Sequence, residues 1–347
     1  MKKEYDLIIT TNIPSYYKTK IWNELANSRK ILVIYSLNHS KEKDSKRSND
    51  FINTDFNYDY ILLNQSLIRA CIELIKLLLT VKYKKIILGS YDEFKWHLLA
   101  WLSSKKKNTV LVETSIYETK TTGWRFLLKK LFFKRISIAL PVGIAHEKAV
   151  RAFGYKGVCV QSGGCGFLNY IKQPDYEEST NGAKKFIWVG RLIKLKRVDL
   201  LIEVFNKHPE LELVVVGDGP EKEQLQLKSN KNITFMGMIN NTELPTIYRK
   251  SDVFILPSDK ETWGLVVEEA LNNGLPVILS DHIGCLDDFI TTNTGLIFTK
   301  GNAVSLEKAI LQMTDKNFYN KLRLGVSKLN FLERKERQLK TYQNLTD

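Results

Sequence analysis

The sequence has few cysteines and no long uninterrupted apolar run. Its four cysteines are widely spaced and form no C-x-x-C pair, so we expect neither a zinc site nor a disulfide framework, and a reducing compartment. The longest apolar stretch, residues 67–81, contains Arg69, Glu73 and Lys76 and is too short to span a bilayer. No signal-peptide h-region precedes the first strand-like segment. We therefore expect a cytoplasmic protein that associates with the inner face of the cell membrane only peripherally.

The second half of the chain lacks the excess of positive charge that the first half carries. Residues 1–173 contain 29 Lys and Arg against 14 Asp and Glu, whereas residues 174–347 contain 23 against 24. A basic surface of this kind attracts polyanions or an anionic membrane. No nucleic-acid-binding module accompanies the charge, so we expect no nucleic-acid partner. The alternative is a Lys-rich surface that only keeps the protein soluble.

Short β-branched runs alternate with helical patterns, which predicts parallel sheets covered on both faces. A length of 347 residues suits two such domains, and we expect them at residues 1–170 and 180–325, followed by a C-terminal helix over 326–347 that packs back on the first domain. In the first domain we expect strands at 5–10, 31–35, 85–89, 109–113 and 137–142, helices at 20–27, 66–79 and 94–104, and a mobile polar loop at 40–53. After a linker near 169–185 we expect strands at 185–189, 211–216, 233–235, 253–256 and 276–279, helices at 198–206, 221–228, 243–250 and 266–272, and a charged helical segment at 305–342.

Two turns in the second half combine cations and glycines. Residues 190–196, GRLIKLK, lie between a strand and a helix, where α/β sheets bind ligands, and Arg191 and Lys196 suit a diphosphate. Residues 214–220, VVVGDGP, lack the third glycine of the nicotinamide-dinucleotide fingerprint. We interpret the second turn as a tight turn near the ligand. A solvated cationic turn and a purely structural glycine turn are the alternatives.

The strongest local signal is residues 257–270, PSDKETWGLVVEEA. A strand is expected to end at Leu256, a loop carries Glu261, and a helix begins near Leu265 with Glu269 one turn in. Backbone N–H groups at a helix start lack intrahelical partners and favour an anion, and a glutamate can accept hydrogen bonds from a ribose diol. For either glutamate alone, a capping or solvated acid is the alternative.

These three segments, in this order and at these separations, resemble the C-terminal domain of retaining GT-B glycosyltransferases of glycosyltransferase family 4. That family's signature is G-R-L-x-x-x-K, then V-G-x-G-P, then E-x-F-G with a second glutamate eight residues after the first. Residues 186–280 cover the resemblance and end in NGLPVI, which matches the family's G-x-P-V strand. Arg197 stands where the family usually has Gly, which puts the turn after Lys196 in doubt. Trp263 replaces the usual Phe and keeps an aromatic ring.

The resemblance implies an α/β protein with the GT-B fold, in which two Rossmann-like doubly wound domains face a central cleft. It implies retaining transfer of a sugar from a nucleotide diphosphate sugar, with UDP expected ahead of GDP, and with no metal ion or other cofactor. Arg191 and Lys196 would hold the diphosphate, and Glu261 would contact the transferred sugar. The nucleobase would lie against residues 235–238, phosphate on the amides of residues 265 and 266, and ribose on Glu269. The donor contacts implied are Gly190, Gly217, Gly219, Met236, Thr262, Gly264, Leu265, Val266 and Glu269.

The first domain resembles the family more loosely. Residues 10–18, TTNIPSYYK, replace the usual glycine-rich loop and are similar to a variant among bacterial surface-polysaccharide transferases. The resemblance implies an acceptor-facing loop with Asn12 and Lys18, the latter a phosphate contact. Glu113 and His146 are further acceptor-side candidates, with purely structural roles as the alternative.

Residues 124–135 combine bulky apolar side chains with five cations at helical spacing. Such a helix is typical of a segment that lies on an anionic leaflet, although it is also typical of an ordinary amphipathic helix. We expect the acceptor to be a lipid-linked saccharide in O-antigen, capsule or exopolysaccharide biosynthesis. The alternatives are a sugar-nucleotide epimerase or phosphorylase of the same architecture, and a catalytically silent sugar-nucleotide-binding protein.

Overall fold

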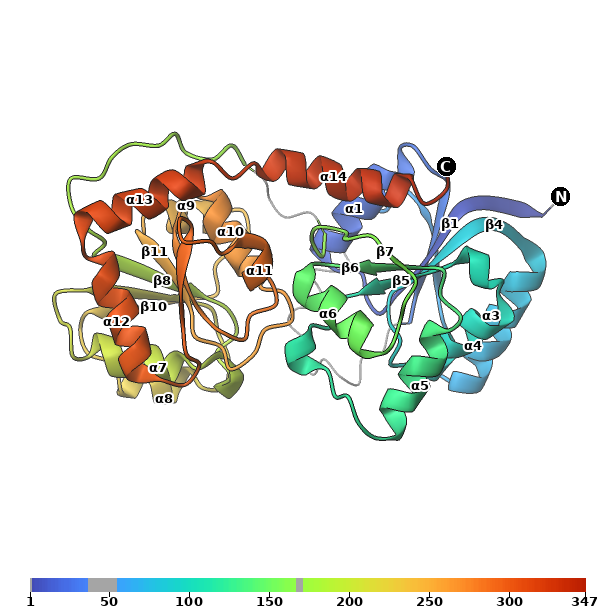
Figure 1. Ribbon diagram of the computed structural model, residues 1–347, viewed down its shortest axis with the longest axis horizontal. Coiled ribbons are helices and arrows are strands. Elements are labelled where there is room, and N and C mark those ends of the chain that lie inside the picture. Colours follow the sequence, from blue (N-terminus) through green and yellow to red (C-terminus); the bar gives the residue numbers. More distant parts are fainter. Residues whose placement is uncertain (1, 37–54, 167–170) are drawn as a thin grey trace. The chain divides into compact units, whose positions relative to one another are not determined.

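The computed structural model describes residues 2–36, 55–166 and 171–347 of the chain, which divides into two units (Figure 1). The first unit comprises Met1–Phe167 together with Glu333–Asp347, and the second comprises Leu168–Leu332. The loop expected over residues 40–53 lies outside the described residues. Residues 171–184, the described part of the expected linker, contain no helix or strand.

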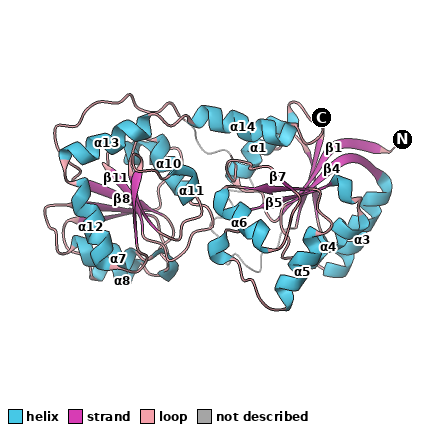
Figure 2. Ribbon diagram, viewed as in Figure 1, coloured by secondary structure: helices cyan, strands magenta, loops and turns pink. Residues whose placement is uncertain are grey.

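The first unit is built on a parallel sheet in the order β3-β2-β1-β4-β5-β6-β7. Its strands are β1 (Lys3–Thr11), β2 (Ile31–Tyr35), β3 (Asp59–Leu62), β4 (Val81–Leu88), β5 (Asn108–Val112), β6 (Ile138–Pro141) and β7 (Val158–Cys159). Its helices are α1 (Tyr16–Ala26), α3 (Leu67–Thr80), α4 (Phe94–Leu102), α5 (Trp124–Phe133) and α6 (Ile144–Ala152), with short 3-10 turns at Lys105–Lys107 and Ile116–Glu118. Figure 2 shows helices on both faces of the sheet, the arrangement that parallel strands require.

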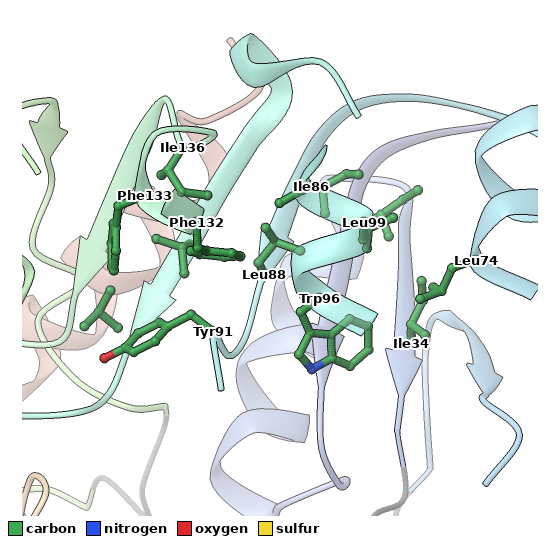
Figure 3. Close-up of a cluster of buried hydrophobic side chains, with 14 of the residues drawn as sticks. Ile34, Leu74, Ile86, Leu88, Tyr91, Trp96, Leu99, Phe132, Phe133 and Ile136 are labelled. Carbon is green, nitrogen blue, oxygen red and sulfur yellow. The ribbon is translucent and has the colours of Figure 1, made fainter. Parts of the chain in front are cut away.

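One face of this sheet is covered by α3, α4 and α5 through a large buried cluster (Figure 3). Leu74 of α3, Trp96 of α4 and Phe132 of α5 all belong to the cluster, and they lie with Ile86 and Leu88 of β4. Tyr91 packs against Phe132 and its neighbours with ring centroids 5.4 to 6.2 Å apart. Burial of this many large side chains fixes the three helices on the sheet, since each contributes about 1.5 to 3 kcal/mol.

The C-terminal helix α14 (Phe331–Gln343) contributes most of its length to the first unit. Tyr342 meets the edge of the Trp22 ring of α1 at 5.2 Å. The amide of Gln338 donates to the carbonyl oxygen of Gly164 over 2.6 Å. Gln338 is buried, so its amide needs a hydrogen-bond partner within the protein. Residues 326–332, which the sequence led us to group with this helix, belong to the second unit.

The second unit is also a parallel sheet, in the order β10-β9-β8-β11-β12-β13. Its strands are β8 (Lys185–Val189), β9 (Glu212–Val216), β10 (Ile233–Gly237), β11 (Val253–Leu256), β12 (Val277–Ser280) and β13 (Gly295–Phe298). Its helices are α7 (Val198–Phe205), α8 (Lys222–Leu227), α9 (Leu244–Arg249), α10 (Leu265–Asn272), α11 (Leu286–Phe289), α12 (Ala303–Met313) and α13 (Lys316–Ser327), with a 3-10 turn at Lys194–Lys196. The buried strands read as nearly continuous apolar runs, as two-sided coverage demands.

The structure adds three strands that the sequence did not predict: β3, β7 and β13. Each has two to four residues, and β3 is largely exposed at the edge of its sheet, so none carries a strong periodic signal. The charged segment expected as one helical stretch over 305–342 is three helices, with breaks near Thr314 and Lys328. In the part of the chain that the structure describes, we find no helix with both the length and the apolar character to traverse a membrane.

Candidate active site

The candidate site is built at the carboxyl edge of the second sheet, where three neighbouring strands end. β9, β8 and β11 lie side by side and run parallel, so the loops that follow them emerge at one edge. Residues 190–196 follow β8, residues 217–220 follow β9 and residues 257–264 follow β11. Ligands of open α/β sheets bind at this edge. Topology therefore gathers the three segments that the sequence singled out.

Glycines let the first two of these loops touch. Gly217 has φ of 133°, and a Cβ on it would lie 1.8 Å from the carbonyl oxygen of Gly190. A Cβ on Gly219 would lie 2.4 Å from the carbonyl oxygen of Leu192, whose N–H donates to Asp218 O over 2.9 Å. Any larger residue at either position would push the loops apart. Close backbone packing thus accounts for both glycines, and their contact with a donor stays a prediction.

Lys196 and Glu261 form an ion pair between Nζ and Oε2. Both side chains are about four-fifths buried, with 18% and 20% exposed. The backbone of Glu261 is fixed by segment 282–284: its N–H donates to His282 O and its carbonyl accepts from the Gly284 N–H, each over 3.0 Å. Two charged residues 65 positions apart are thereby held in contact, each on a loop anchored to the sheet. Arg191 lies exposed on the same turn as Lys196.

Helix α10 begins at Leu265, four residues after Glu261. Gly264 has φ of 103° and forms the N-cap. Leu265 and Val266 are the first two residues of the helix, and both are partly exposed. The first N–H groups of a helix lack intrahelical acceptors and carry the positive end of its dipole. Thr262 precedes the cap and is partly exposed. This arrangement can accept an oxyanion next to the Lys196 ammonium.

Glu269 lies one turn into α10 and has an unusual protonation equilibrium. Burial raises the pKa of Glu269 to about 7, while the Tyr248 hydroxyl, which donates to Oε2 over 3.3 Å, lowers it. Tyr248 comes from α9 and was not predicted from the sequence, because nothing local in residues 244–249 points to a carboxylate 21 positions later. A carboxyl group that titrates near neutrality becomes a stronger acceptor of hydroxyl hydrogen bonds when it loses its proton.

Trp263 and Glu268 form a second contact that the sequence did not predict. The indole Nε1 of Trp263 donates to Glu268 Oε1 over 2.6 Å, and Glu268 is 1% exposed. A buried carboxylate needs such a donor. A tryptophan five residues before an acid was the available signal. The phenylalanine that is usual in the family has no N–H group and could not donate this bond. Trp263 can, and Glu268 is its acceptor.

Met236 lies at the end of β10, the strand next to β9. Its side chain is 40% exposed and that of Met238 is 61% exposed. Flexible thioethers at a sheet edge suit the face of a planar ring. Their contact with a nucleobase remains a prediction.

The acceptor-side candidates occupy different environments in the first unit. Lys18 of α1 and Glu113, which follows β5, form an ion pair of 2.8 Å. Burial lowers the pKa of Lys18, but the Glu113 carboxylate outweighs burial, so the pKa lies above its usual value. Asn12 is exposed and its Oδ1 accepts from Ser36 Oγ over 3.4 Å. His146 is 0% exposed within α6, which places its ring below the surface.

Among the residues with described positions, no three His, Cys, Asp or Glu side chains form a cluster that could hold a metal ion. The expectation that catalysis needs no metal is a statement about the reaction, and this finding leaves it a prediction. The positive groups that the sequence assigned to an anionic ligand at the candidate site are Arg191, Lys196 and the start of α10.

A family model described as "Glycosyl transferases group 1" matches residues 171–326. This segment contains the whole candidate site. The chain is 40% identical over 121 residues to the sulfoquinovosyl transferase SQD2 of Arabidopsis thaliana, a match that covers 33% of this chain and 24% of that protein. It is 38% identical over 105 residues to the O-antigen biosynthesis glycosyltransferase WbnH of Escherichia coli, covering 30% of each. The match thus spans less than a third of the length of these relatives.

The whole fold is similar to that of HepE from Anabaena, whose structure was solved in complex with UDP. The TM-score is 0.69 at 14% sequence identity, and the similarity covers 99% of this chain and 100% of HepE. At this identity the similarity concerns the fold, and it confirms the pair of parallel-sheet α/β domains expected from the sequence.

Proposed function

We propose that this chain transfers a sugar from a nucleotide diphosphate sugar to a saccharide acceptor. The premise is that residues 171–326 match the glycosyl transferases group 1 family and that the chain has the GT-B fold. The observation that carries the proposal is the contact of Lys196 with Glu261 beside the start of α10. It puts a cation, an anion-binding helix start and a carboxylate within one small region.

In the proposed mechanism, Lys196 and Arg191 hold the donor diphosphate and stabilise the charge that develops on it as the glycosidic bond breaks. Preoriented cations and backbone N–H groups are the main contribution that a protein makes to such a step. Binding of the diphosphate would draw the Lys196 ammonium away from Glu261. The Glu261 carboxylate would then accept hydrogen bonds from the hydroxyls of the transferred sugar.

Glu269 would bind the ribose diol, and Met236 would lie against the base. Burial of Glu269 against Tyr248 supports this role, since a desolvated carboxylate forms strong hydrogen bonds when it is charged. UDP is the proposed nucleotide because HepE was solved with UDP, with GDP as the second candidate. Retention of anomeric configuration and independence of metal rest on the family resemblance.

The first test is thermal stabilisation by UDP, GDP, ADP, CMP and NAD, for the wild type and Glu269→Ala. A ligand that binds only the native state raises the melting temperature. We expect one nucleoside diphosphate to raise it and Glu269→Ala to abolish the shift. A shift by NAD alone, or by no nucleotide, would contradict the proposal.

Turnover distinguishes the transferase from related enzymes. With the nucleotide sugar identified, a transferase should release nucleoside diphosphate faster when acceptor is added. An epimerase should convert the nucleotide sugar without acceptor, and a phosphorylase should need inorganic phosphate. A protein that binds the nucleotide sugar and does none of these would be the catalytically silent alternative.

We further propose a lipid-linked saccharide of a bacterial surface polysaccharide as the acceptor, reached while the first unit lies on the anionic inner face of the cell membrane. The match to an O-antigen transferase supports the acceptor class. The surface formed by α3, α4 and α5, which we name the three-helix face, supports the membrane contact. Each of these helices packs against its neighbour (Figure 1), so their exposed apolar residues lie on one surface of the first unit. Its exposed apolar residues are Leu67, Ile68, Ile72, Ile75, Leu79, Phe94, Trp101, Leu102, Trp124, Leu127, Leu128 and Leu131.

The spacing on α3 shows that this exposure is organised. Ile68, Ile72, Ile75 and Leu79 recur at intervals of four, three and four residues, so they form one stripe on the outward side, while Ala70, Leu74 and Leu77 are buried on the opposite side. Trp124, Leu128 and Leu131 form a similar stripe on α5. Exposed apolar stripes on neighbouring helices are typical of an interaction surface.

Charge selects the membrane over a second copy as the partner of this face. The half of the chain that contains it carries 29 Lys and Arg against 14 Asp and Glu, so two copies face to face would repel, whereas anionic lipid would attract. The exposed cations of α5 and its end include Arg125, Lys130 and Lys134. Lys129 and Arg135 have internal partners, Asp92 and the backbone carbonyls of Trp101 and Ser103.

Sedimentation with vesicles tests the membrane proposal. Wild type should bind vesicles of anionic phospholipid and not vesicles of phosphatidylcholine. The triple variant Arg125→Glu, Lys130→Glu, Lys134→Glu and the double variant Ile68→Ser, Ile72→Ser should each release it, and Leu227→Ser, a control at an 88% exposed position in the second unit, should not. Equal binding by all forms would overturn the assignment of this face.

A further inference from the structure

Arg197 has a backbone conformation that arginine rarely adopts. Its φ is 51° and its ψ is 39°, and within the described ranges it is the only residue other than glycine with positive φ. It joins the Lys194–Lys196 turn to the first residue of α7. The left-handed conformation costs an L-residue free energy because Cβ crowds the following carbonyl. Glycine would avoid this cost, which is the reason that a glycine suits this position in the family that the chain resembles.

The side chain of Arg197 makes contacts that glycine could not make. Nε lies 3.1 Å from Asp199 Oδ1, and Nη1 lies 3.2 Å from Asp259 Oδ1. Asp199 belongs to the first turn of α7, whereas Asp259 belongs to the loop after β11. The guanidinium therefore connects the two loops that carry Lys196 and Glu261, and it is well suited to do so because it can serve two carboxylates at once.

The backbone adds a second connection at the same place. The N–H of Asp259 donates to the carbonyl oxygen of Leu195 over 3.0 Å. Leu195 is the neighbour of Lys196, and Asp259 lies two residues before Glu261. The two loops thus meet at three points: this backbone bond, the bridge of Arg197 to Asp259, and the pair of Lys196 with Glu261.

We propose that Arg197 is a positioning residue that locks the Lys196 turn to the Glu261 loop, so that the two loops keep their relative position while the donor binds. The inference rests on the proposed function for the identity of the donor. The lock matters most when a diphosphate draws Lys196 away from Glu261, because the direct pair then no longer connects the loops. The bridge through Asp259 is remote from the reacting atoms and can persist.

If Arg197 had no role in positioning the two loops, the variant Arg197→Gly would be expected to keep its activity, whereas our proposal predicts a loss. Arg197→Gly removes the crowded Cβ from a left-handed position, so it should leave the protein at least as stable if the bridge has no further role. Under the proposal the same change loosens the two loops, and small misplacement of catalytic groups lowers the rate steeply. Stability and activity therefore move independently in this variant.

The experiment compares Arg197→Gly, Arg197→Lys, Asp259→Asn and the double variant of Arg197→Gly with Asp259→Asn. Lys207→Ala is the matched control, since Lys207, which follows the end of α7, forms an exposed ion pair with Glu203 of that helix. We expect kcat/KM to fall roughly 10- to 100-fold for Arg197→Gly and Asp259→Asn with unchanged melting temperature. The double variant should lose no more than either single one, and Arg197→Lys should recover part of the loss.

Amide hydrogen exchange measures how firmly the Lys196 turn holds the Glu261 loop, and it needs no substrate. Amides of residues 258–262 should exchange faster in Arg197→Gly and Asp259→Asn than in wild type and Lys207→Ala. Unchanged exchange together with wild-type activity would overturn the inference, as would additive losses in the double variant. If wild type transfers no sugar, the proposed function fails, and faster exchange in the two single variants would still support the lock.

Discussion

The two units share a strand order but use the edges and faces of their sheets differently. In each sheet the first strand lies in the middle, the next two extend to one side and the rest to the other. The loops of the second unit at the carboxyl edge are packed by Gly217 and Gly219 and carry the recognisable motifs. The first unit instead concentrates positive charge and exposes the apolar three-helix face. The same framework thus carries the proposed donor site in one unit and the proposed membrane-binding surface in the other.

A pair of Lys with Glu occurs in both units, and the two pairs differ in their anchoring. Lys196 and Glu261 both lie on loops, between strands β8 and β11 and their following helices. Lys18 lies within helix α1, and its charge is balanced by Glu113 next to β5. A loop can reorganise around a ligand at lower cost than a helix, because helical residues are bound by their own hydrogen bonds. We infer that the first pair is suited to exchange partners and the second to hold structure.

Removal of the loop-borne cation should have the largest effect. Lys196→Ala deletes the group that we propose stabilises the leaving diphosphate, so we expect kcat to fall about 100- to 1,000-fold, the range for loss of one preoriented donor to a developing anion. Lys194→Ala, on the same turn but exposed, is the control and should retain activity. The measurement is steady-state release of nucleoside diphosphate. Wild-type kcat in Lys196→Ala would remove the diphosphate role from this residue.

Removal of the helix-borne cation should act on stability instead. Lys18→Met leaves the partly buried Glu113 carboxylate without its ion-pair partner, which costs up to about 3 kcal/mol. Denaturant unfolding measures the loss, and the second change Glu113→Gln should restore much of it. Affinity for the nucleotide should stay unchanged in both variants. If Lys18 binds an acceptor phosphate as the sequence suggested, KM for acceptor should rise in the double variant, whose fold is restored.

Protonation of Glu269 gives the third test, with a smaller effect on affinity. The pKa of Glu269 is raised from its ordinary value to about 7 in the folded chain, so its contribution to stability is fully present below pH 4.5 and is lost as pH rises through 7. Glu269→Gln should therefore be more stable than wild type at pH 8, by up to about 3 kcal/mol, and nearly equal to it at pH 4.5.

Nucleotide binding should respond to the same proton in the opposite direction. The charged carboxylate is the better acceptor for ribose hydroxyls, so wild-type affinity should fall about 10-fold as pH drops from 8 to 6. Glu269→Gln should bind about 10-fold more weakly at pH 8 and show little dependence on pH. Calorimetric titration at both pH values measures this. An identical pH dependence in the variant would assign the proton to another group.

Much of the second unit was accessible from the sequence because its signals are local. The strands β8, β9, β11 and β12 are short apolar runs ending in Gly, Pro or Ser, and each was predicted within two residues. The first unit was harder: α1 begins at Tyr16, four residues before the expected start, because Ser15 and Pro14 lead directly into it. The strand β4 begins at Val81 immediately after α3 ends, so helix and strand merged into one apolar run.

The sequence determined the alternation of strands and helices, the division into two units and the three motifs of the second unit, since each depends on residues close together in the chain. Tertiary structure decided which distant residues meet: Lys196 with Glu261, Arg197 with Asp259, and Glu269 with Tyr248. Strand order and the closeness of backbone packing set these contacts. Tertiary structure also decided that α3 presents an apolar stripe on its outward side. Periodicity identifies two apolar faces on this helix, but only packing selects the face that is buried.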